Sequence, residues 1–462
     1  MKILPRTKLP DVTQVLGQFE DESFDTDETV FLKKQGRMEG KFCQLATSGL
    51  RPDRIYVGLG KRSELTHERL RKAVAAAHKA LMKLKVKEYR TNLHTVLDDA
   101  VETVAEAMLL SDYTFEHYKA DKKPSTIKTV YMETADKKAL ARARVKADAT
   151  CYARDLINTP PNILYPAYMV KEAKKLHGGK IKVTTFDKAA LKKGKFGGIL
   201  AVGLGSARDP AFTIVDYNPG KGKTVAFVGK GVTFDSGGVN IKPGSYMESM
   251  ECDMSGAAAA LSIVKAAAEL KIPHRVIAAL PLAENMPSAT AYRPDDIVRM
   301  YSGKTVEMIN TDAEGRMLLA DALAYTEQTY KPDLMVDFAT LTGACVVALG
   351  YFHSGIMTND DALATDLIAA GQSSGDTLWR LPLGPEYRDR MKSDIADVRN
   401  CGKGRDAGTV TAGIFLSHFV DSTRWAHIDI AGTAFLPEPQ GYKPKYATGA
   451  GVRMAVEFLQ QL

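Results

Sequence analysis

Short apolar runs and helical spacing alternate along the first third of the chain. Residues 54–60, RIYVGLG, form an apolar run that ends in a glycine turn, and we predict a buried strand there. Residues 65–84 place apolar side chains three and four positions apart, as on one face of a helix, and residues 95–113 form a second amphipathic segment. This region has no concentrated set of acids, histidines or glycines, so the pattern indicates a supporting α/β domain.

A long helical pattern over residues 136–158 separates this region from the rest of the chain. It stops at NTPPN, residues 158–162, because two consecutive prolines cannot continue a helix and also restrict the residue before them. We place the domain boundary inside or just before this helix. The prediction is a smaller N-terminal α/β domain at residues 1–145 and a second domain at residues 146–462.

Beyond the prolines, apolar runs that end in Gly, Pro, Asn or Asp alternate with helical segments such as residues 255–270. We interpret the runs as strands, at residues 197–206, 224–231, 275–285, 333–344 and 425–432. This rhythm is typical of a mainly parallel sheet with helices on both faces. Such sheets hold their sites at the carboxyl ends of the strands, so we expect the functional side chains directly after the runs.

The composition is typical of soluble proteins, with 45% hydrophobic and 25% charged residues, and the length of 462 residues suits two domains. The net charge of +7 is a small surplus, since 62 basic residues stand against 55 acidic ones. The lysine-rich stretches are interleaved with acids or apolar residues. They indicate solvated helix faces rather than a stripe that binds nucleic acid.

The cysteines argue for a reducing compartment. Cys43, Cys151, Cys252, Cys345 and Cys401 have no CxxC spacing, and an odd number in apolar contexts disfavours a disulfide framework. The chain has no apolar stretch of about 18 residues, and its N-terminus lacks the apolar core of a signal peptide. We therefore expect a cytoplasmic protein without a membrane span.

Charged side chains lie at the end of the run at residues 224–231 and directly after it. Lys230 stands between two glycines, Asp235 follows in a loop rich in glycine, Lys242 comes next, and Asp253 opens an alanine-rich helix. The glycines let the backbone approach another group closely. Taken singly, these residues are better explained without a functional site: Lys230 and Asp235 by an ordinary ion pair, and Asp253 by a helix N-cap.

The heptad NTDAEGR, residues 310–316, carries two more acids just before a helical pattern. Asp312 and Glu314 by themselves suit helix capping, because acids favour the positive N-terminal end of a helix. All four carboxylates, however, fall at strand ends or helix starts of one predicted sheet. Without cations they would repel one another and their pKa values would rise sharply.

Two divalent cations resolve this repulsion, because four positive charges balance four negative ones and oxygen ligands suit such ions. A histidine-based zinc site is disfavoured, since the sequence has no HExxH motif and none of its nine histidines forms a ligand-like pair. We interpret His427 as a packed core residue.

Four segments together resemble the signatures of the leucyl (cytosol) aminopeptidase family of dinuclear metallopeptidases: NTDAEGR, VGKGVTFDSGG, DFATLTGA and NTPPN. The resemblance spans roughly residues 150 to 462, whereas the first 145 residues match only in general layout. It implies a C-terminal three-layer α/β catalytic domain with a mainly parallel central sheet, a smaller N-terminal α/β domain, and a homohexamer whose active sites face an internal cavity.

The resemblance also implies a set of metal ligands. Asp235 and Glu314 would bridge two divalent ions, either Mn²⁺ or Zn²⁺. Lys230 and Asp253 would complete the tighter site, and Asp312 the more exchangeable one, partly through its main-chain carbonyl. A ligating lysine must be neutral, which a nearby dication enforces.

The implied reaction is the release of apolar, leucine-like residues from small peptides with a free N-terminus, by a water that the two metals share. Lys242 would stay protonated and polarise the scissile carbonyl, and Arg316 would hold a bicarbonate ion that passes protons.

The first side-chain subsite can be placed in the same way. Its lining would be apolar and soft, formed by Met250, Thr340, Gly343 and Ala431. Some family members carry methionine where this chain has Ala434, so a roomier pocket is expected. The segment from Asn400 departs from the usual family spacing, since Lys403 stands between two glycines.

Three other functions are compatible with parts of the pattern. A two-metal hydrolase of phosphate esters or other amides would need similar carboxylates, but the chain has no GxxxxGK[ST] phosphate loop. A DNA-binding accessory role, alongside or instead of peptidase activity, is permitted by the net charge of +7 but lacks a concentrated basic face. A structural hexamer with an inactive site conflicts with the presence of every expected ligand.

Overall fold

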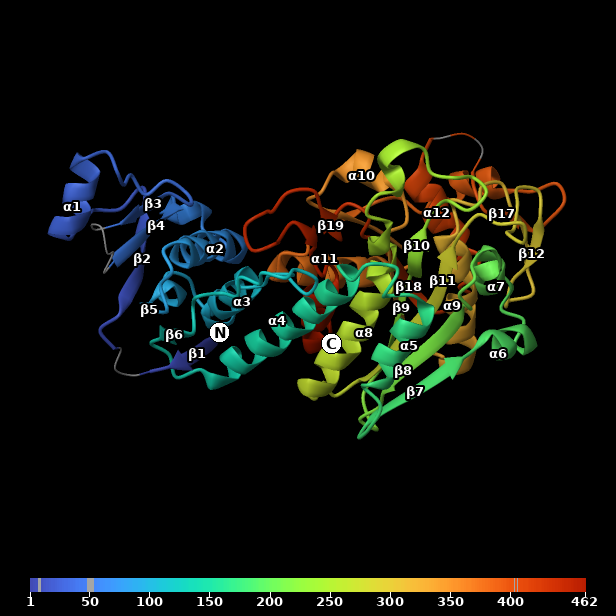
Figure 1. The fold of residues 1–462 in the computed structure, drawn as a ribbon, viewed down its shortest axis with the longest axis horizontal. Coiled ribbons are helices and arrows are strands. Elements are labelled where there is room, and N and C mark those ends of the chain that lie inside the picture. Colours follow the sequence, from blue (N-terminus) through green and yellow to red (C-terminus); the bar gives the residue numbers. More distant parts are fainter. Residues whose placement is uncertain (7–9, 48–53, 403, 405) are drawn as a thin grey trace. The chain divides into compact units, whose positions relative to one another are not determined.

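The computed structural model describes residues 1–6, 10–47, 54–402, 404 and 406–462, which divide into two compact units (Figure 1). The first unit holds Met1–Cys151 and Pro437–Lys445, and the second holds Tyr152–Leu436 and Tyr446–Leu462. The division falls inside helix α4 (Lys137–Ile157), which ends just before the prolines. A split into domains at residues 145 and 146 stays a prediction.

The first unit is built on a six-stranded sheet in the order β1-β6-β5-β2-β4-β3, parallel except where β3 meets β4. Its strands are β1 (Lys2–Pro5), β2 (Thr13–Phe19), β3 (Leu45–Thr47), β4 (Arg54–Gly60), β5 (Glu88–Thr91) and β6 (Thr129–Met132). Its helices are α1 (Asp27–Lys34), α2 (His67–Lys83) and α3 (Val101–Ser111). The predicted strand at 54–60 and helix at 65–84 are confirmed, whereas the segment at 95–113 becomes α-helical only at Val101.

The second unit holds a nine-stranded sheet in the order β16-β15-β18-β14-β9-β11-β8-β7, with β10 beside β11. Its strands are β7 (Ile181–Phe186), β8 (Ala211–Tyr217), β9 (Thr224–Gly229), β10 (Gly231–Asp235), β11 (Arg275–Asn285), β14 (Leu334–Ala339), β15 (Ser354–Thr358), β16 (Leu378–Arg380) and β18 (Arg424–Asp429). The central strands β11, β9, β14 and β18 run parallel, and antiparallel pairs flank them. The predicted mixed α/β fold with a mainly parallel sheet is confirmed.

The remaining elements of the second unit are mostly helical. They are α5 (Pro166–Lys174), α6 (Lys188–Lys193), α7 (Gly197–Val202), α8 (Ser255–Glu269), α9 (Gly315–Tyr330), α10 (Gly343–Leu349), α11 (Asp361–Ser374), α12 (Gly408–Ser417) and α13 (Val452–Gln461). Short strands complete it: β12 (Ile297–Arg299), β13 (Thr305–Glu307), β17 (Val398–Arg399), β19 (Phe435–Leu436) and β20 (Tyr446–Ala447). The 3-10 turns of the chain are η1 (Arg62–Glu64), η2 (Leu93–Thr95), η3 (Gly203–Gly205), η4 (Gly244–Met247), η5 (Met250–Met254) and η6 (Pro385–Met391).

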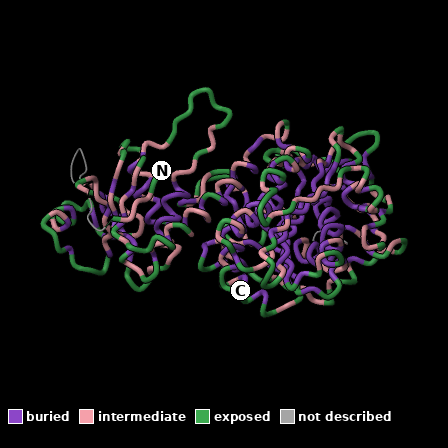
Figure 2. Tube along the Cα trace, turned by 90° about the horizontal axis from the view of Figure 1, so that it is seen from below, coloured by how far each residue is buried: buried purple, intermediate pink, exposed green. Residues whose placement is uncertain are grey.

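Helices cover both faces of this sheet because successive strand residues point to opposite sides. On one face, α9, α7 and α12 join a core with inward side chains such as Val228, Ile277 and Trp425. On the other face, α8 and α13 lie over Phe227 and Phe338, whose rings stack at 6.1 Å. The buried residues, purple in Figure 2, fill the interior of each unit.

One predicted strand is wrong. Residues 197–206 form the short helix α7 and the turn η3 rather than a strand. An apolar run of this length cannot be assigned to a strand or a helix by periodicity alone. The tertiary structure decides, because the main-chain N–H of Ile199 donates to the buried Asp321 carboxylate at 3.0 Å and so secures the helix start.

No helix of the described residues is both long and apolar enough to cross a membrane. Lys403, which sets the unusual spacing after Asn400, lies outside the described residues.

Candidate active site

The predicted site residues come together where the central strands of the second unit end. Lys230 directly follows β9, Asp235 is the last residue of β10, and Asp253 lies in η5, just before α8. Two expectations need correction: Asp235 belongs to a strand rather than a loop, and Asp253 precedes the alanine-rich helix in a separate 3-10 turn. β10 (GVTFD) pairs with β11 through a register that shifts between Val232 and Asp235, and the glycines that suggested a loop follow the strand at Gly237 and Gly238.

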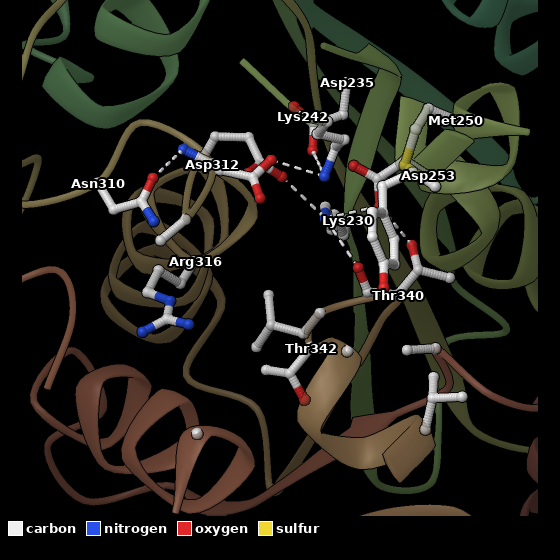
Figure 3. Close-up of a pocket in the computed structure, with 18 of the residues that line it drawn as sticks. Lys230, Asp235, Lys242, Met250, Asp253, Asn310, Asp312, Arg316, Thr340 and Thr342 are labelled. Atoms are coloured by element: carbon white, nitrogen blue, oxygen red, sulfur yellow. Dashed lines mark hydrogen bonds and ion pairs between the residues drawn. The ribbon is translucent and has the colours of Figure 1, made fainter. Parts of the chain in front are cut away.

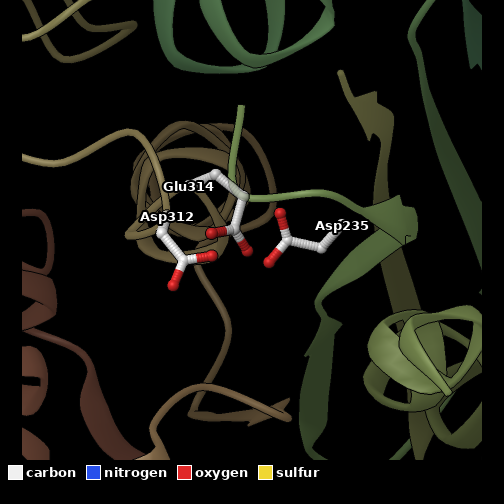
Figure 4. A group of neighbouring side chains, drawn as sticks. All are labelled: Asp235, Asp312 and Glu314. Carbon is white, nitrogen blue, oxygen red and sulfur yellow. The ribbon is translucent and has the colours of Figure 1, made fainter. Parts of the chain in front are cut away.

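Three carboxylates form a compact group at this edge of the sheet. Asp235, Asp312 and Glu314 each offer one oxygen, and these oxygens all lie within 4.8 Å of one another. Figure 4 shows the three side chains directed toward a common point. Asp235 and Glu314 are buried, and Asp312 is partly exposed. Like charges this close are stable only with positive charge nearby.

Two lysines supply part of that positive charge (Figure 3). The Lys230 Nζ lies 2.7 Å from Asp253 Oδ1 and 2.9 Å from Glu314 Oε1, and it donates to the main-chain oxygen of Thr340 at 2.8 Å. The Lys242 Nζ lies 2.8 Å from Asp235 Oδ2 and 2.6 Å from Asp312 Oδ1. Lys230 thereby brings Asp253 into the carboxylate group.

The pKa values show that this compensation is incomplete. Burial, reinforced by Glu314, raises the pKa of Asp235 to about 7 despite the neighbouring lysines. Burial and Glu314 also raise the pKa of Asp253 and of Asp312. Asp235, Asp253 and Asp312 therefore still resist ionisation beside two ammonium groups. Additional positive charge would stabilise their ionised forms.

The remaining acid and the lysines behave in the opposite way. Burial favours the protonated form of Glu314, yet Lys230 and Lys242 hold its pKa below the ordinary value. Burial alone would lower the pKa of Lys230, but Asp253, Glu314 and Asp235 outweigh it, so this pKa is raised. In the absence of metal ions, Lys230 is therefore an ammonium group.

Helix capping does not explain the acids of NTDAEGR. Glu314 immediately precedes α9, but its side chain makes no capping hydrogen bond to the helix. The Asp312 carboxylate contacts Lys242 instead. Both side chains therefore point toward Asp235 and the two lysines rather than toward the main chain of α9.

The glycine of the heptad has a steric role. A Cβ atom added at Gly315 would lie 2.3 Å from Cε and 2.7 Å from Nζ of Lys230. Any larger residue would therefore displace the Lys230 side chain from its place between Asp253 and Glu314.

The donor set fits hard divalent cations. Most of the donor atoms are carboxylate oxygens, which such ions prefer as ligands. In addition, Asp253 Oδ2 is buried without a hydrogen-bond partner among the described residues. A buried carboxylate oxygen without a partner is costly, and a cation satisfies it. The residues present therefore fit a metal centre.

Sequence reasoning missed two uncharged residues that hold Asp235 and the main chain just before Asp312. Asn285 Nδ2 donates to Asp235 Oδ1 at 2.7 Å and to the Thr311 main-chain oxygen at 3.0 Å, and the Tyr292 hydroxyl donates to that same oxygen at 2.8 Å. Asn285 ends an apolar run and so carried a weak positional signal, whereas Tyr292 carried none.

A cavity of about 450 Å³ opens over the acids. It is lined by all the residues that the sequence predicted for the site, namely Lys230, Asp235, Lys242, Met250, Asp253, Asp312, Glu314, Arg316, Thr340, Gly343 and Ala431. Ala434 is fully buried and is not among the lining residues, and a roomier pocket stays a prediction. His427 is buried in the core, as predicted, with Nδ1 2.6 Å from Asp337 Oδ1.

Arg316 faces the cavity from the first turn of α9. Its Nη1 donates to the main-chain oxygen of Asn400 at 2.7 Å, and its buried Nε has no hydrogen-bond partner among the described residues. The guanidinium group and the positive end of α9 together favour an anion at this point.

The sequence of this chain matches a known protein family over most of its length. Residues 151–456 match the catalytic domain of the cytosol aminopeptidase family, and residues 34–122 match its N-terminal domain. A probable cytosol aminopeptidase from Geotalea uraniireducens is 43% identical over 425 residues, which cover 88% of this chain and 85% of that protein. One from Cenarchaeum symbiosum is 40% identical over 438 residues, covering 92% and 90%.

Solved structures agree over nearly the whole chain. The cytosol aminopeptidase from Coxiella burnetii superposes with a TM-score of 0.89 at 31% identity and covers 99% of both chains. The bottromycin maturation enzyme BotP in complex with Mn gives a TM-score of 0.90 at 34% identity, with 98% of this chain and 99% of that one covered. With its two domain matches, its relatives and its buried carboxylates, this chain belongs to the cytosol aminopeptidase family of dinuclear metal-dependent exopeptidases.

Proposed function

We propose that this protein uses two divalent metal ions to release apolar, leucine-like residues from the free N-terminus of small peptides. The carboxylate group carries the proposal, because Asp235, Asp312 and Glu314 bring three oxygens within 4.8 Å of one another beneath a cavity of about 450 Å³. That cavity is large enough for an amino-acid side chain and the adjoining peptide bond.

Asp235 and Glu314 are the proposed bridging ligands, with Lys230 and Asp253 completing one site and Asp312 the other. The contacts of Lys230 support this division. Its ammonium group occupies the space between Asp253 and Glu314, so a dication and a proton compete for the same nitrogen. We propose Mn²⁺ or Zn²⁺ as the ions, since both accept nitrogen and oxygen ligands.

When bound, the ions supply a Lewis acid for the carbonyl, an anchor for the free α-amine, and an acidified water. Lys242 then has the task of donating a hydrogen bond to the oxygen that gains charge as the carbonyl is attacked. Its side chain is 14% exposed and already lies within ion-pair distance of two acids, so it keeps its proton and its orientation. Burial opposes the charge on Lys242, but Asp235 and the other acids outweigh it and raise its pKa.

Arg316 is the proposed holder of a bicarbonate ion, which would accept a proton from water and return it to the leaving amine. The support is the unpartnered Nε beside the start of α9. The apolar side chain of the substrate is proposed to contact Met250, Thr340, Gly343 and Ala431, which line the cavity together.

Assembly and compartment belong to the same proposal. A homohexamer is supported by the family and by large apolar side chains of the second unit that are exposed in the single chain, such as Val347 at 89%, Phe352 at 65% and Trp379 at 60%. A cytoplasmic location follows the names of the relatives. The DNA-binding alternative stays a prediction from the net charge of +7, which a gel shift at two salt concentrations tests.

The proposal is tested by assaying dialysed protein after Mn²⁺ or Zn²⁺ is added back. We expect turnover of leucine p-nitroanilide but none of its N-acetylated form or of p-nitrophenyl phosphate, because only the first offers a free α-amine. Glu314→Ala should abolish turnover and release both ions without changing the oligomer. Unchanged turnover in that variant would contradict the bridging role.

A further inference from the structure

A fully buried asparagine outside the proposed ligand set holds the segment that leads to the acids of NTDAEGR. Asn400 Oδ1 accepts from the main-chain N–H of Ile309 at 2.7 Å and of Asn310 at 3.3 Å. Asn400 Nδ2 donates to the main-chain oxygen of Asn310 at 2.7 Å. The side chain thus contacts both polar groups of a main-chain segment 90 residues earlier in the chain, two positions before Asp312.

The main chain of the same residue holds Arg316. The carbonyl of Asn400 accepts from Arg316 Nη1 at 2.7 Å, and its N–H donates to the main-chain oxygen of Glu307 at 2.9 Å. Because Arg316 Nε has no hydrogen-bond partner among the described residues, the Asn400 carbonyl is the contact that orients the guanidinium group. Asn310, Arg316 and Cys401 all line the cavity next to this contact.

We propose that Asn400 is a positioning residue that fixes the guanidinium group of Arg316 relative to the metal-binding segment 310–314. The inference rests on the proposed function, because it gives Arg316 a task in the reaction. Asn400 contacts neither the acids nor the proposed substrate pocket. It acts through Arg316 and through the main chain that carries Asp312.

The chemistry of an amide side chain explains the residue type. Asparagine offers an acceptor and a donor side by side, which match the N–H and C=O groups of the segment it holds. Aspartate would place a second acceptor against the Asn310 carbonyl, and alanine would leave the main-chain groups of Ile309 and Asn310 without these partners. Either change frees the Asn400 carbonyl to move and takes the fixed acceptor from Arg316.

The experiment compares Asn400→Ala, Arg316→Ala and the double variant, using leucine p-nitroanilide and metal-loaded full-length protein. We expect Asn400→Ala to lower kcat on the order of 100-fold, with a much smaller change in KM and with both metal ions retained. The loss in the double variant should match that of Arg316→Ala alone within about threefold, since residues that act through one group are not additive.

Asn359→Ala is the matched control. Asn359 also uses its side chain to hold main-chain groups, with Oδ1 accepting from Trp425 N–H at 2.8 Å and Nδ2 donating to the Thr423 oxygen at 3.0 Å, but it lies at the opposite end of β18 from the cavity. It should leave kcat unchanged. If Asn400→Ala does not fold, Asn400→Asp, which has the same shape, takes its place in the comparison.

The outcomes separate this inference from the function on which it rests. Losses that multiply in the double variant would overturn the positioning role of Asn400 and leave a purely structural one. Full activity in Arg316→Ala would overturn the task of Arg316 and the inference with it. Absence of peptidase turnover in the metal-loaded wild type would overturn the proposed function itself.

Discussion

At the scale of single residues, Lys242 separates catalysis from metal binding. It contacts two acids, but its proposed task is to stabilise charge in the transition state. Lys242→Ala should therefore keep its metal ions while kcat falls by roughly 100-fold to 1,000-fold. Metal analysis beside steady-state kinetics checks this, and Lys188→Ala, which removes a surface ion pair with Asp209, is the control. Loss of metal in parallel with activity would instead make Lys242 a support of the centre.

Gly315 offers a second test at this scale, because stability and activity should move apart. A Cβ atom there would lie 2.3 Å from Lys230 Cε. Gly315→Ala should abolish most of the activity by displacing Lys230, although alanine at the first position of α9 has a better helix propensity than glycine. Thermal unfolding and kcat/KM measured on one preparation check the prediction, and an active variant would show that Lys230 can move without cost.

At the scale of elements, the buried Asp321 connects α9 to helix α7 and to the turn at Tyr301. Asp321 Oδ2 accepts from Ile199 N–H at 3.0 Å, and its Oδ1 accepts from Tyr301 N–H at 2.8 Å. Burial raises the pKa of Asp321 to about 7, although these hydrogen bonds oppose the shift. A raised pKa means that the folded state favours the proton, so the associated stability is present below pH 4 and is lost as the pH rises through 7.

Asp321→Asn should therefore be less stable than the wild type at pH 5, because one main-chain N–H loses its acceptor, and the difference should shrink by pH 8. Urea midpoints at the two pH values check this. Glu327→Gln is the control: burial favours protonation of Glu327, but hydrogen bonds from the N–H groups of Asp421, Ser422 and Thr423 lower its pKa, so its effect should not change between pH 5 and 8. A constant difference for Asp321→Asn would contradict the prediction.

The elements also show where sequence reasoning ends. Lys230, Asp235 and Glu314 could be predicted as site residues because charged residues near glycines at strand ends or helix starts form a local pattern. Asn400 could not, because its role depends on hydrogen bonds to residues about 90 positions away, and an asparagine in a loop has many ordinary explanations. Helix α7 was missed for the same reason, since Asp321, far along the chain, secures its first turn.

At the scale of the whole molecule, the site draws on one of the two units, so metal removal should act unevenly. At an ion concentration of 100 times Kd, binding adds about 2.7 kcal/mol to the stability of the folded state. For a unit of this size we expect chelation to lower the melting temperature of the second unit by roughly 5 °C. Calorimetry with EDTA checks this, and Glu314→Ala should show no such shift. An equal shift in both transitions would contradict a site confined to one unit.

Helix α9 has one further consequence. This one continuous helix carries Glu314 and Arg316 at its start, Asp321 in its middle and Glu327 near its end. A tilt of the helix at its C-terminal end would therefore move Glu314 and Arg316 at its N-terminal end, even if no side chain beside them were changed. In a library screened for inactive but well-expressed protein, we expect inactivating substitutions far from the substrate to accumulate along this helix. They should also accumulate in the segments whose main-chain N–H groups donate to Asp321 and Glu327, and both regions should collect more of them than an equally buried helix on the other face of the sheet.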